Sequence, residues 1–247
     1  MDMKKKKLIK LGVTAACLIV LYALCIYMDQ AITATSRLYM LITVVRKSAV
    51  YALVAVSMNL LNGFTGLFSL GQAGFMLLGA YAYAVLCIPV AKRAGVYQQF
   101  EGGLIQFSLP ETFANLFGEG AGTVVGILIA LLIGGLIAAL MAYLIGLPVL
   151  RLKSDYLAIA TLGFAEILRA FFQWNALGPI TNGSNLLKGY PDFGHAWAYL
   201  ILIAIFIGII LLMVNSTYGR AFKAIRDDEV AAEAMGINLA HHKRLAF

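Results

Sequence analysis

The sequence predicts an all-α protein, a polytopic transmembrane helical bundle of about six spans. Two observations lead to this fold class. The chain has 247 residues, of which 62% are hydrophobic and 13% are charged, whereas soluble domains are about 45–50% apolar and about 25% charged. The apolar residues also form several nearly uncharged runs of roughly 20 residues, the helix length that crosses about 30 Å of hydrocarbon.

The apolar runs give the candidate spans in order. They are Leu8–Met28, Ser48–Leu61, Gly66–Val90, Thr123–Leu147, Tyr156–Trp174 and Ala196–Val214. The first run follows the basic segment MDMKKKK, but it is longer than the apolar part of a signal peptide and lacks a clear cleavage site. We therefore expect it to be retained as an anchor whose amino terminus is cytoplasmic.

Lys and Arg residues between the spans set the expected orientation. With the amino terminus inside, Leu147–Asp155 and Tyr218–Arg244 become cytoplasmic connections, and both carry Lys and Arg, as the positive-inside rule requires. Arg46 and Lys47 disturb this pattern, so the second span could instead begin near Leu38. Topology accounts for the net charge of +7, and no basic and aromatic platform remains to bind a nucleic acid.

The longest polar insertion is Ala91–Gly122. It contains Glu101, Glu111 and Glu119 and falls on the outer side of the membrane in this topology. We expect an external loop with a short interfacial helix around Leu109–Phe117.

Missing motifs exclude several kinds of enzyme. The chain contains no G-x-x-x-x-G-K-[ST], H-E-x-x-H or G-x-S-x-G motif, so these routes to hydrolysis of ATP or peptides are absent. The cysteines lie in apolar runs without C-x-x-C spacing, and the histidines offer no ligand geometry. We therefore expect a non-enzyme, with no metal and no cofactor bound by this chain.

Glycines are dense where the second candidate span ends and the third begins. In a helix each glycine costs roughly 1 kcal/mol relative to Ala, so the segment predicts an interrupted helix. Such interruptions line the substrate site of transporters, because freed backbone groups are tolerated only within protein or in a wet cavity. Alternatively, the small residues simply let helices pack closely and Gln72 bonds to a neighbour. The residues predicted to line a translocation path are Gly66, Ser69, Gly71, Gln72 and Gly74.

The fifth candidate span carries two ionisable residues, Glu166 and Arg169. Ser154 and Asp155 are suited to start its helix, and residues three apart share one helical face. We predict a structural ion pair between Glu166 and Arg169. The alternative is that Glu166 relays protons, which would suit a secondary transporter.

The most highly charged segment is RAFKAIRDDEVAAEAMGINLAHHKR, residues 220–244. It is long enough for one or two short helices, with Ser216 or Thr217 as the first cap and Gly236 as a helix end. Lys223 and Asp227 are spaced to pair. A small, smooth patch that could dock into a groove is expected at Ala231, Ala232, Ala234 and Met235. The alternative is a solvated charged loop.

Three stretches together resemble one family. GRAFKAIRDDEVAAEAMGIN (219–238) is similar to the cytoplasmic loop of ATP-binding-cassette (ABC) importer permeases of the LivM type, which serve branched-chain amino acids. NLLNGFTGLFSLGQAGFMLLGAY (59–81) and GLPVLRLKSDYLAIATLGFAEILR (146–169) are similar to other segments of those permeases. The resemblance therefore extends over most of residues 59–247.

The resemblance implies a single transmembrane permease domain over residues 1–247, in which residues 218–244 form a cytoplasmic coupling loop. In that family the loop is a coupling helix that sits in a cleft of the ATPase subunit. The residues that this implies for ATPase coupling are Arg220, Arg226, Asp227, Asp228, Glu229, Ala231, Ala232 and Gly236. Family members continue through further helices, so we expect this chain to be truncated at its carboxyl terminus.

The resemblance also implies partners and a location. The partners would be a homologous second permease, two cassette ATPase subunits that bind ATP and Mg, and an extracytoplasmic substrate-binding protein. The location would be the bacterial cytoplasmic (inner) membrane, with lipid around a multi-pass chain whose amino terminus is cytoplasmic. Two alternatives remain: a proton-coupled secondary transporter, and an ABC permease for urea or short amides.

Overall fold

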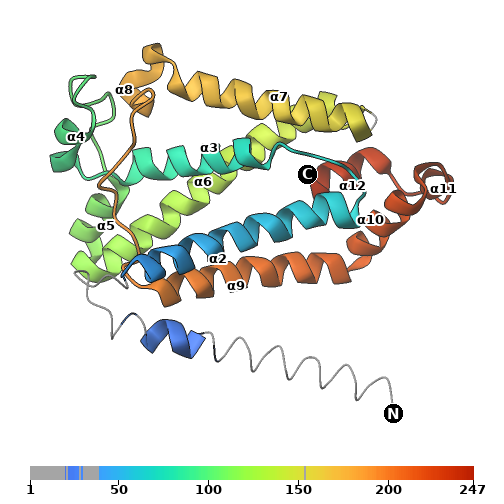
Figure 1. Cartoon of the computed structure of the whole chain (residues 1–247), viewed down its shortest axis with the longest axis horizontal. Helices are drawn as coiled ribbons and strands as arrows, with labels where there is room; N and C mark the ends of the chain where they lie inside the picture. The colour runs from blue at the N-terminus through green and yellow to red at the C-terminus, as the bar shows by residue number, and fades with distance from the viewer. Residues whose placement is uncertain (1–19, 21, 28, 30–38, 153) are drawn as a thin grey trace. The chain divides into compact units, whose positions relative to one another are not determined.

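The computed structural model describes residues 20, 22–27, 29, 39–152 and 154–247. Within those residues the chain forms helices and no strand (Figure 1), which confirms the all-α prediction. Contacts divide the chain into two compact units. Unit 1 comprises residues 1–56 and 193–211, and unit 2 comprises residues 57–192 and 212–247.

Unit 1 contains most of two long helices, α2 (Tyr39–Asn59) and α9 (Ala196–Asn215). The backbone N–H of Ala196 donates to the Asp29 carboxylate at 2.6 Å, so a side chain satisfies a donor at the first turn of α9. Arg46 of α2 donates to the Gly194 carbonyl, and its guanidinium lies 5.5 Å from the centre of the Tyr199 ring.

These partners explain why the predicted second span begins too late in the sequence. The prediction that it begins at Ser48 is wrong, and the alternative start near Leu38 is right, because α2 begins at Tyr39. Arg46 therefore lies inside the helix, where its charge is tolerated because it binds a carbonyl and an aromatic face.

Unit 2 holds a larger set of helices. They are η1 (Leu60–Phe64), α3 (Gln72–Cys87), α4 (Val90–Val96), α5 (Leu109–Phe117), α6 (Glu119–Val149), α7 (Ser154–Gln173), η2 (Asn175–Leu177), α8 (Gly178–Thr181), α10 (Thr217–Asp227), α11 (Glu229–Ala234) and α12 (Leu239–Ala246).

Among the described residues, three helical segments are long and apolar enough to cross a membrane: Tyr39–Phe64, Glu119–Val149 and Ala196–Asn215. A fourth span results if Asp155–Gln173 and Asn175–Thr181, which are bent by 58° at their junction, are counted together. The helix α3 is apolar but has only 16 residues. Most of the predicted first span, Leu8–Met28, lies outside the described residues.

The helices α5 and α6 form a tight hairpin. The helix predicted at Leu109–Phe117 is confirmed with those bounds, and Gly118 makes the turn with φ +89°. Gly122 and Gly126 of α6 face α5 so closely that a Cβ would lie 2.1 Å from the Phe113 oxygen and 2.6 Å from the Pro110 Cα. Small residues thus set the distance between the helices.

The segment between α3 and α5 is held in place by Arg93, which is 2% exposed. Its guanidinium donates to the Val85 and Phe107 carbonyls, each at 2.8 Å. Burial lowers the pKa of Arg93 from its ordinary value, because a low-dielectric setting disfavours the charged form. Backbone carbonyls offset part of this cost, so α4 and Phe107 are held against the end of α3.

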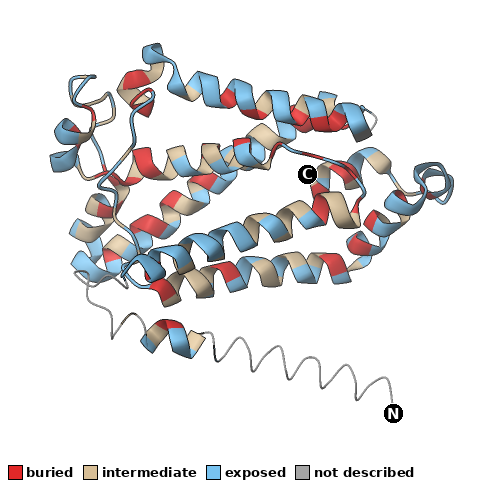
Figure 2. Ribbon diagram, in the orientation of Figure 1, coloured by how far each residue is buried: buried red, intermediate tan, exposed pale blue. Residues whose placement is uncertain are grey.

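The helix α3 lies against both α6 and α7. A Cβ on Gly134 of α6 would lie 3.1 Å from the Gly79 oxygen, and a Cβ on Gly74 would lie 3.0 Å from the Ala165 Cα. The buried residues of α7 recur at helical spacing and its other face is exposed (Figure 2). Unit 2 therefore positions the segment before α3 against α7.

Substitution of Gly122 by Ala is expected to destabilise the α5–α6 hairpin. The added methyl group would overlap the Phe113 carbonyl, and overpacking costs about 1–3 kcal/mol, which lowers Tm by several degrees. Gly135→Ala in the same helix is the matched control, because its Cβ would have no neighbour within 4 Å. Thermal unfolding in detergent checks the difference, and equal Tm values for the two variants would contradict the packing described.

Candidate functional site

The helix interruption predicted by the glycines lies between α2 and α3. The helix α2 runs into the π-helical turn η1, and α3 begins only at Gln72. The Thr65 hydroxyl donates to the Leu60 carbonyl at 3.1 Å, and the Leu67 N–H donates to the Leu61 carbonyl at 3.2 Å. The prediction of a helix from Gly66 onward is therefore wrong for its first turns, because Gly66 has φ +73°, a conformation that ends a helix.

The non-helical stretch takes its hydrogen bonds from side chains. The Ser69 N–H donates to the Asn62 amide oxygen at 3.2 Å, and the Leu70 N–H donates to the Thr161 hydroxyl of α7 at 3.0 Å. Thr161 is 2% exposed and donates in turn to the Leu157 carbonyl at 2.9 Å. Polar partners are needed here because an unpaired backbone group at membrane depth costs several kcal/mol.

The residues predicted to line a path divide into two groups. Ser69, Gly71 and Gly74 are buried. A Cβ on Gly71 would lie 3.1 Å from the Thr161 Cβ, and a Cβ on Gly74 would lie 3.0 Å from the Ala165 Cα, so both glycines pack closely against α7. Gln72 is partly exposed, and its amide lies 3.5 Å from the Ser57 hydroxyl. Gly66 instead faces Arg226.

The charged segment forms three short helices, where one or two were expected. Ser216 is the cap of α10, because its hydroxyl accepts from the Tyr218 N–H at 3.2 Å, and Gly236 follows α11 with φ +85°; both predictions are confirmed. Asp228 caps α11 by accepting from two backbone N–H groups at 2.8 and 3.0 Å. Asn238 caps α12 by accepting from the His241 N–H at 3.0 Å. The three helices are called the coupling segment below.

The helices of the coupling segment are anchored by buried residues. Phe222 and Ile225 of α10 are 0% and 1% exposed. Lys243 of α12 is buried and donates to the Glu229 carboxylate at 2.7 Å. The Phe247 ring contacts the Phe75 ring of α3 edge to face, with centroids 5.4 Å apart. The segment is thus a folded part of unit 2, which differs from the alternative of a solvated loop.

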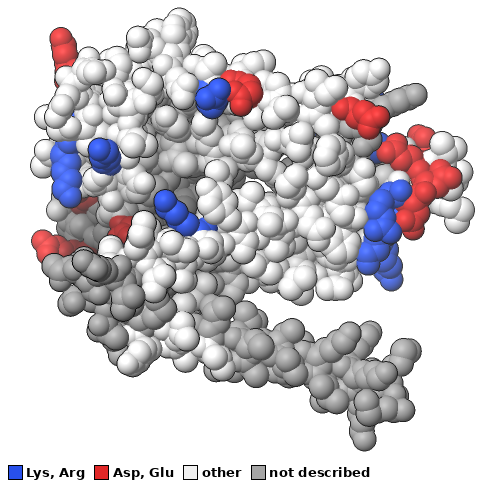
Figure 3. Space-filling view, in the orientation of Figure 1, with Lys and Arg blue, Asp and Glu red and all other residues white. Residues whose placement is uncertain are grey.

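The acidic residues predicted for ATPase coupling have partners inside the segment. Asp227 pairs with Arg226 at 3.0 Å. Its predicted partner was Lys223, whose Nζ instead lies 5.6 Å from the centre of the Phe64 ring. Asp228 is the N-cap of α11, and Glu229 forms an ion pair with Lys243. Acidic and basic side chains accordingly gather over α10 and α11 (Figure 3).

One side of α11 and the residue that follows it exposes apolar side chains, while Glu229 and Glu233 are exposed beside them. Val230 and Met235 are 78% and 83% exposed, and Ala231 and Ala234 are exposed between them. Ala232, which was predicted to face a partner, is 4% exposed and points inward. We call Val230, Ala231, Ala234 and Met235 the α11 tip. Sequence reasoning missed Val230, although an apolar residue within so charged a segment is itself a signal.

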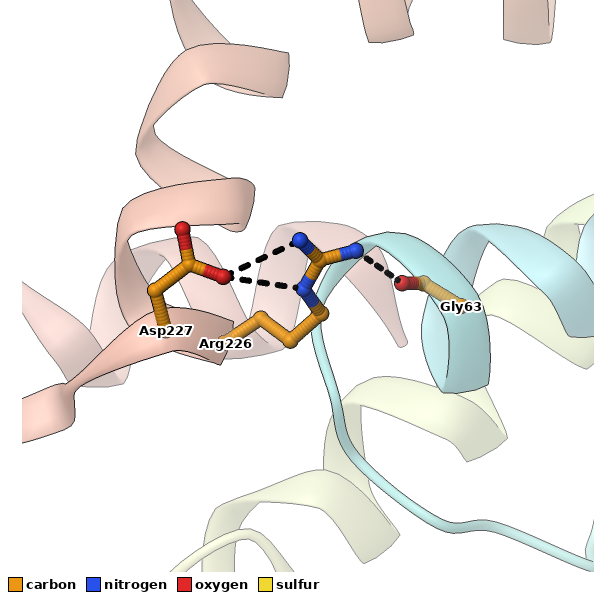
Figure 4. Close-up of polar contacts among 3 residues, drawn as sticks. All are labelled: Gly63, Arg226 and Asp227. Atoms are coloured by element: carbon orange, nitrogen blue, oxygen red, sulfur yellow. Dashed lines mark hydrogen bonds and ion pairs between the residues drawn. The ribbon is translucent and has the colours of Figure 1, made fainter.

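Arg226 joins the coupling segment to the helix interruption (Figure 4). One nitrogen of its guanidinium, Nη1, donates to the Gly63 carbonyl of η1 at 3.1 Å. Its Nε and Nη2 donate to the Asp227 carboxylate at 3.2 and 3.0 Å. A Cβ on Gly66 would lie 2.8 Å from the Arg226 Cγ. The two sets of residues predicted separately are therefore in contact.

The remaining sequence candidates are placed as follows. Arg169 donates to Glu166 at 2.8 Å, and both side chains are more than half exposed. Arg220 is exposed on α10. Within the described ranges, no group of three or more His, Cys, Asp or Glu residues could hold a metal ion.

Thr161→Val tests the support that α7 gives to the interrupted helix. Valine keeps the shape but removes the acceptor of the Leu70 N–H, and an unsatisfied buried group costs about 1–3 kcal/mol. We expect a lower Tm and faster amide hydrogen exchange over residues 66–72. Thr123→Val is the control, because the Thr123 hydroxyl bonds to the Glu119 carbonyl within its own helix. Unchanged exchange in Thr161→Val would contradict this role.

Comparisons with known proteins agree on one family. The model described as "branched-chain amino acid transport system / permease component" matches residues 40–247. The high-affinity branched-chain amino acid transport system permease proteins LivM of Escherichia coli (strain K12) and Salmonella typhimurium (strain LT2) are each 28% identical over 232 residues, covering 80% of this chain and 46% of theirs. The probable branched-chain amino acid transport permease protein LivM of Methanocaldococcus jannaschii is 26% identical over 208 residues, covering 75% of this chain and 56% of its own.

The chain thus spans about half the length of the curated relatives it matches. No solved structure matches it. The family match nevertheless includes every described element from α2 to α12, and the apolar helices are those of a multi-pass membrane protein. This chain belongs to the family of permease components of branched-chain amino acid transport systems.

Proposed function

We propose that this chain acts as a permease subunit of an ABC importer for branched-chain amino acids, and that the α11 tip is its docking surface for a cassette ATPase. The observation that carries the proposal is the capped, three-helix coupling segment with an exposed apolar tip. Val230 and Met235 are among the most exposed apolar residues described. Burial of such a side chain contributes about 1.5–3 kcal/mol.

The composition of the tip favours one kind of partner surface. The apolar residues are flanked by Asp228, Glu229 and Glu233, which are exposed. A matching cleft would have an apolar floor and a basic rim, because complementary charge guides the encounter while apolar burial supplies the affinity. ATP and Mg would be bound by the ATPase subunits. A second, homologous permease and an extracytoplasmic binding protein would complete the importer.

The direction of transport and the membrane in which the chain lies follow from the same proposal. The coupling segment would lie on the cytoplasmic side of the bacterial inner membrane together with the amino terminus. Closure of two ATPase subunits would then move the segment and tilt the helices between outward-facing and inward-facing states, a rigid-body change. Branched-chain amino acids are the substrate class because the relatives are named for them.

A proton-coupled mechanism finds little support around Glu166. Its carboxylate is already bound by Arg169 at 2.8 Å, and 57% of its side chain is exposed, which is the geometry of a surface pair. Uptake that continues after the proton gradient is dissipated would exclude that mechanism, while uptake that stops would exclude the ABC importer. Competition by unlabelled urea against labelled leucine would separate short amides from branched-chain amino acids.

Two aspartates at the tip are expected to abolish docking. Val230→Asp with Met235→Asp removes the apolar surface but leaves every capping side chain and ion pair in place, because Met235 ends α11 through its backbone N–H alone. Binding of the ATPase should therefore weaken at least about tenfold. The permease is tagged in its native membrane, extracted in mild detergent, and the copurifying ATPase is quantified together with leucine uptake. The wild-type permease must retain the ATPase for the proposed function to stand.

The matched control is Leu186→Asp. Leu186 is 77% exposed and lies in the segment after α8, outside the coupling segment. Its ATPase content should equal that of the wild type. If the double variant also retains the ATPase, the α11 tip is not the docking surface, although the family assignment is unaffected. Charge reversal at Asp228 or Glu229 would be a poorer test, because it removes a helix cap or leaves Lys243 unpaired.

A further inference from the structure

We propose that Arg226 is a positioning residue that passes movement of the coupling segment to the interrupted helix at Gly63. This inference rests on the proposed function and names the side chain through which the coupling would run. Sequence resemblance placed Arg226 on the surface that meets the ATPase. Its guanidinium instead donates to a backbone carbonyl 163 positions earlier in the chain.

The hydrogen bond to Gly63 falls where the helix cannot supply one. Carbonyls at the end of a helix lack intrahelical donors, and η1 ends at Phe64, immediately after Gly63. Arg226 Nη1 provides a charged donor at 3.1 Å. A charged donor makes a stronger hydrogen bond than a neutral one, so the end of η1 is tied to α10 rather than to water.

The aliphatic part of Arg226 makes a second contact with the interruption. A Cβ on Gly66 would lie 2.8 Å from the Arg226 Cγ and 3.3 Å from its Cα. The backbone after η1 therefore passes directly under the side chain, and Gly66 also needs φ +73°. A movement of α10 toward this backbone would push on it, because a contact at van der Waals distance cannot be compressed.

Asp227 orients the guanidinium. Its carboxylate accepts from Nε and Nη2, which leaves Nη1 directed at Gly63. The two side chains are 45% and 69% exposed, so solvent screens their attraction and the pair adds little to stability. Its effect is geometric: the planar fork of arginine is fixed on one side by Asp227 and binds Gly63 with the other.

The fold of α10 does not depend on Arg226. Phe222 and Ile225 are buried, and Ser216 caps the first turn. Replacement of Arg226 should therefore leave the coupling segment folded and its tip available. Transmission of movement to η1 would be lost while the ATPase still docks. This outcome separates a positioning role of Arg226 from a structural one.

The test measures ATPase binding, ATP hydrolysis and leucine uptake for the same reconstituted complex. Arg226→Ala is expected to retain the ATPase and hydrolyse ATP at the wild-type rate within about twofold, while uptake per ATP falls about tenfold. Arg226→Lys should recover part of the uptake, because an ammonium can bind Gly63 but cannot also be fixed by Asp227. Arg151→Ala, which removes an exposed arginine between α6 and α7, should match the wild type.

Each result decides a different point. Uptake per ATP within about twofold of the wild type in Arg226→Ala would overturn the inference. Loss of the ATPase together with uptake would also overturn it, since Arg226 would then serve docking or folding. If the wild-type permease binds no ATPase, the proposed function itself is refuted. This result differs from the two Arg226→Ala results above.

The contact can be tested without any partner. Gly66→Ala lowers Tm through its positive φ and through the overlap with Arg226. In an Arg226→Ala background the Cγ is absent, so the loss of Tm caused by Gly66→Ala should shrink by about half. An equal loss in both backgrounds would show that residues 66 and 226 are not in contact, and the inference would fail.

Discussion

The arrangement of unit 2 depends on how the chain satisfies its backbone where α2 gives way to α3. A span that leaves the helical conformation exposes N–H and C=O groups that hydrocarbon cannot bind. Here Ser69 N–H is bound by Asn62, Leu70 N–H by Thr161, and the Gly63 carbonyl by Arg226. The donors and acceptors come from η1, α7 and α10, so the interruption brings together elements that are distant in the sequence.

Short polar side chains at the helix starts stabilise the short helices of the coupling segment. Helices of 11, 6 and 8 residues, as in α10, α11 and α12, are too short to be stable alone. Each begins at a side-chain cap, from Ser216, Asp228 and Asn238 respectively, and each cap contributes about 1 kcal/mol. Burial of Phe222 and the Lys243–Glu229 pair then fix the coupling segment in one orientation, which a docking surface requires.

The structure also changes how the charged segment is interpreted. Its acidic residues suggested a surface that meets a partner through charge, but Asp227, Asp228 and Glu229 have internal partners. Exposed Val230 and Met235 are then the side chains free to be buried by a partner. Under the proposed function, this segment of the chain would carry affinity at its tip and transmit movement at its base through Arg226.

The sequence by itself determined the features that depend on neighbouring residues. The fold class, the helix Leu109–Phe117, a cap at Ser216 or Thr217, the end at Gly236 and the glycine interruption all follow from periodicity, composition and local propensity. The family, too, was recognisable from contiguous motifs.

Only the tertiary structure decided the contacts between distant segments. Gly194 and Tyr199 are the partners that accommodate Arg46 within α2, the support for Leu70 comes from Thr161, and the role proposed for Arg226 depends on Gly63. No local pattern encodes which backbone group lacks a partner, because that is known only when the chain is folded. The physical reason is that hydrogen-bond satisfaction belongs to the whole fold, whereas helix propensity belongs to a few consecutive residues.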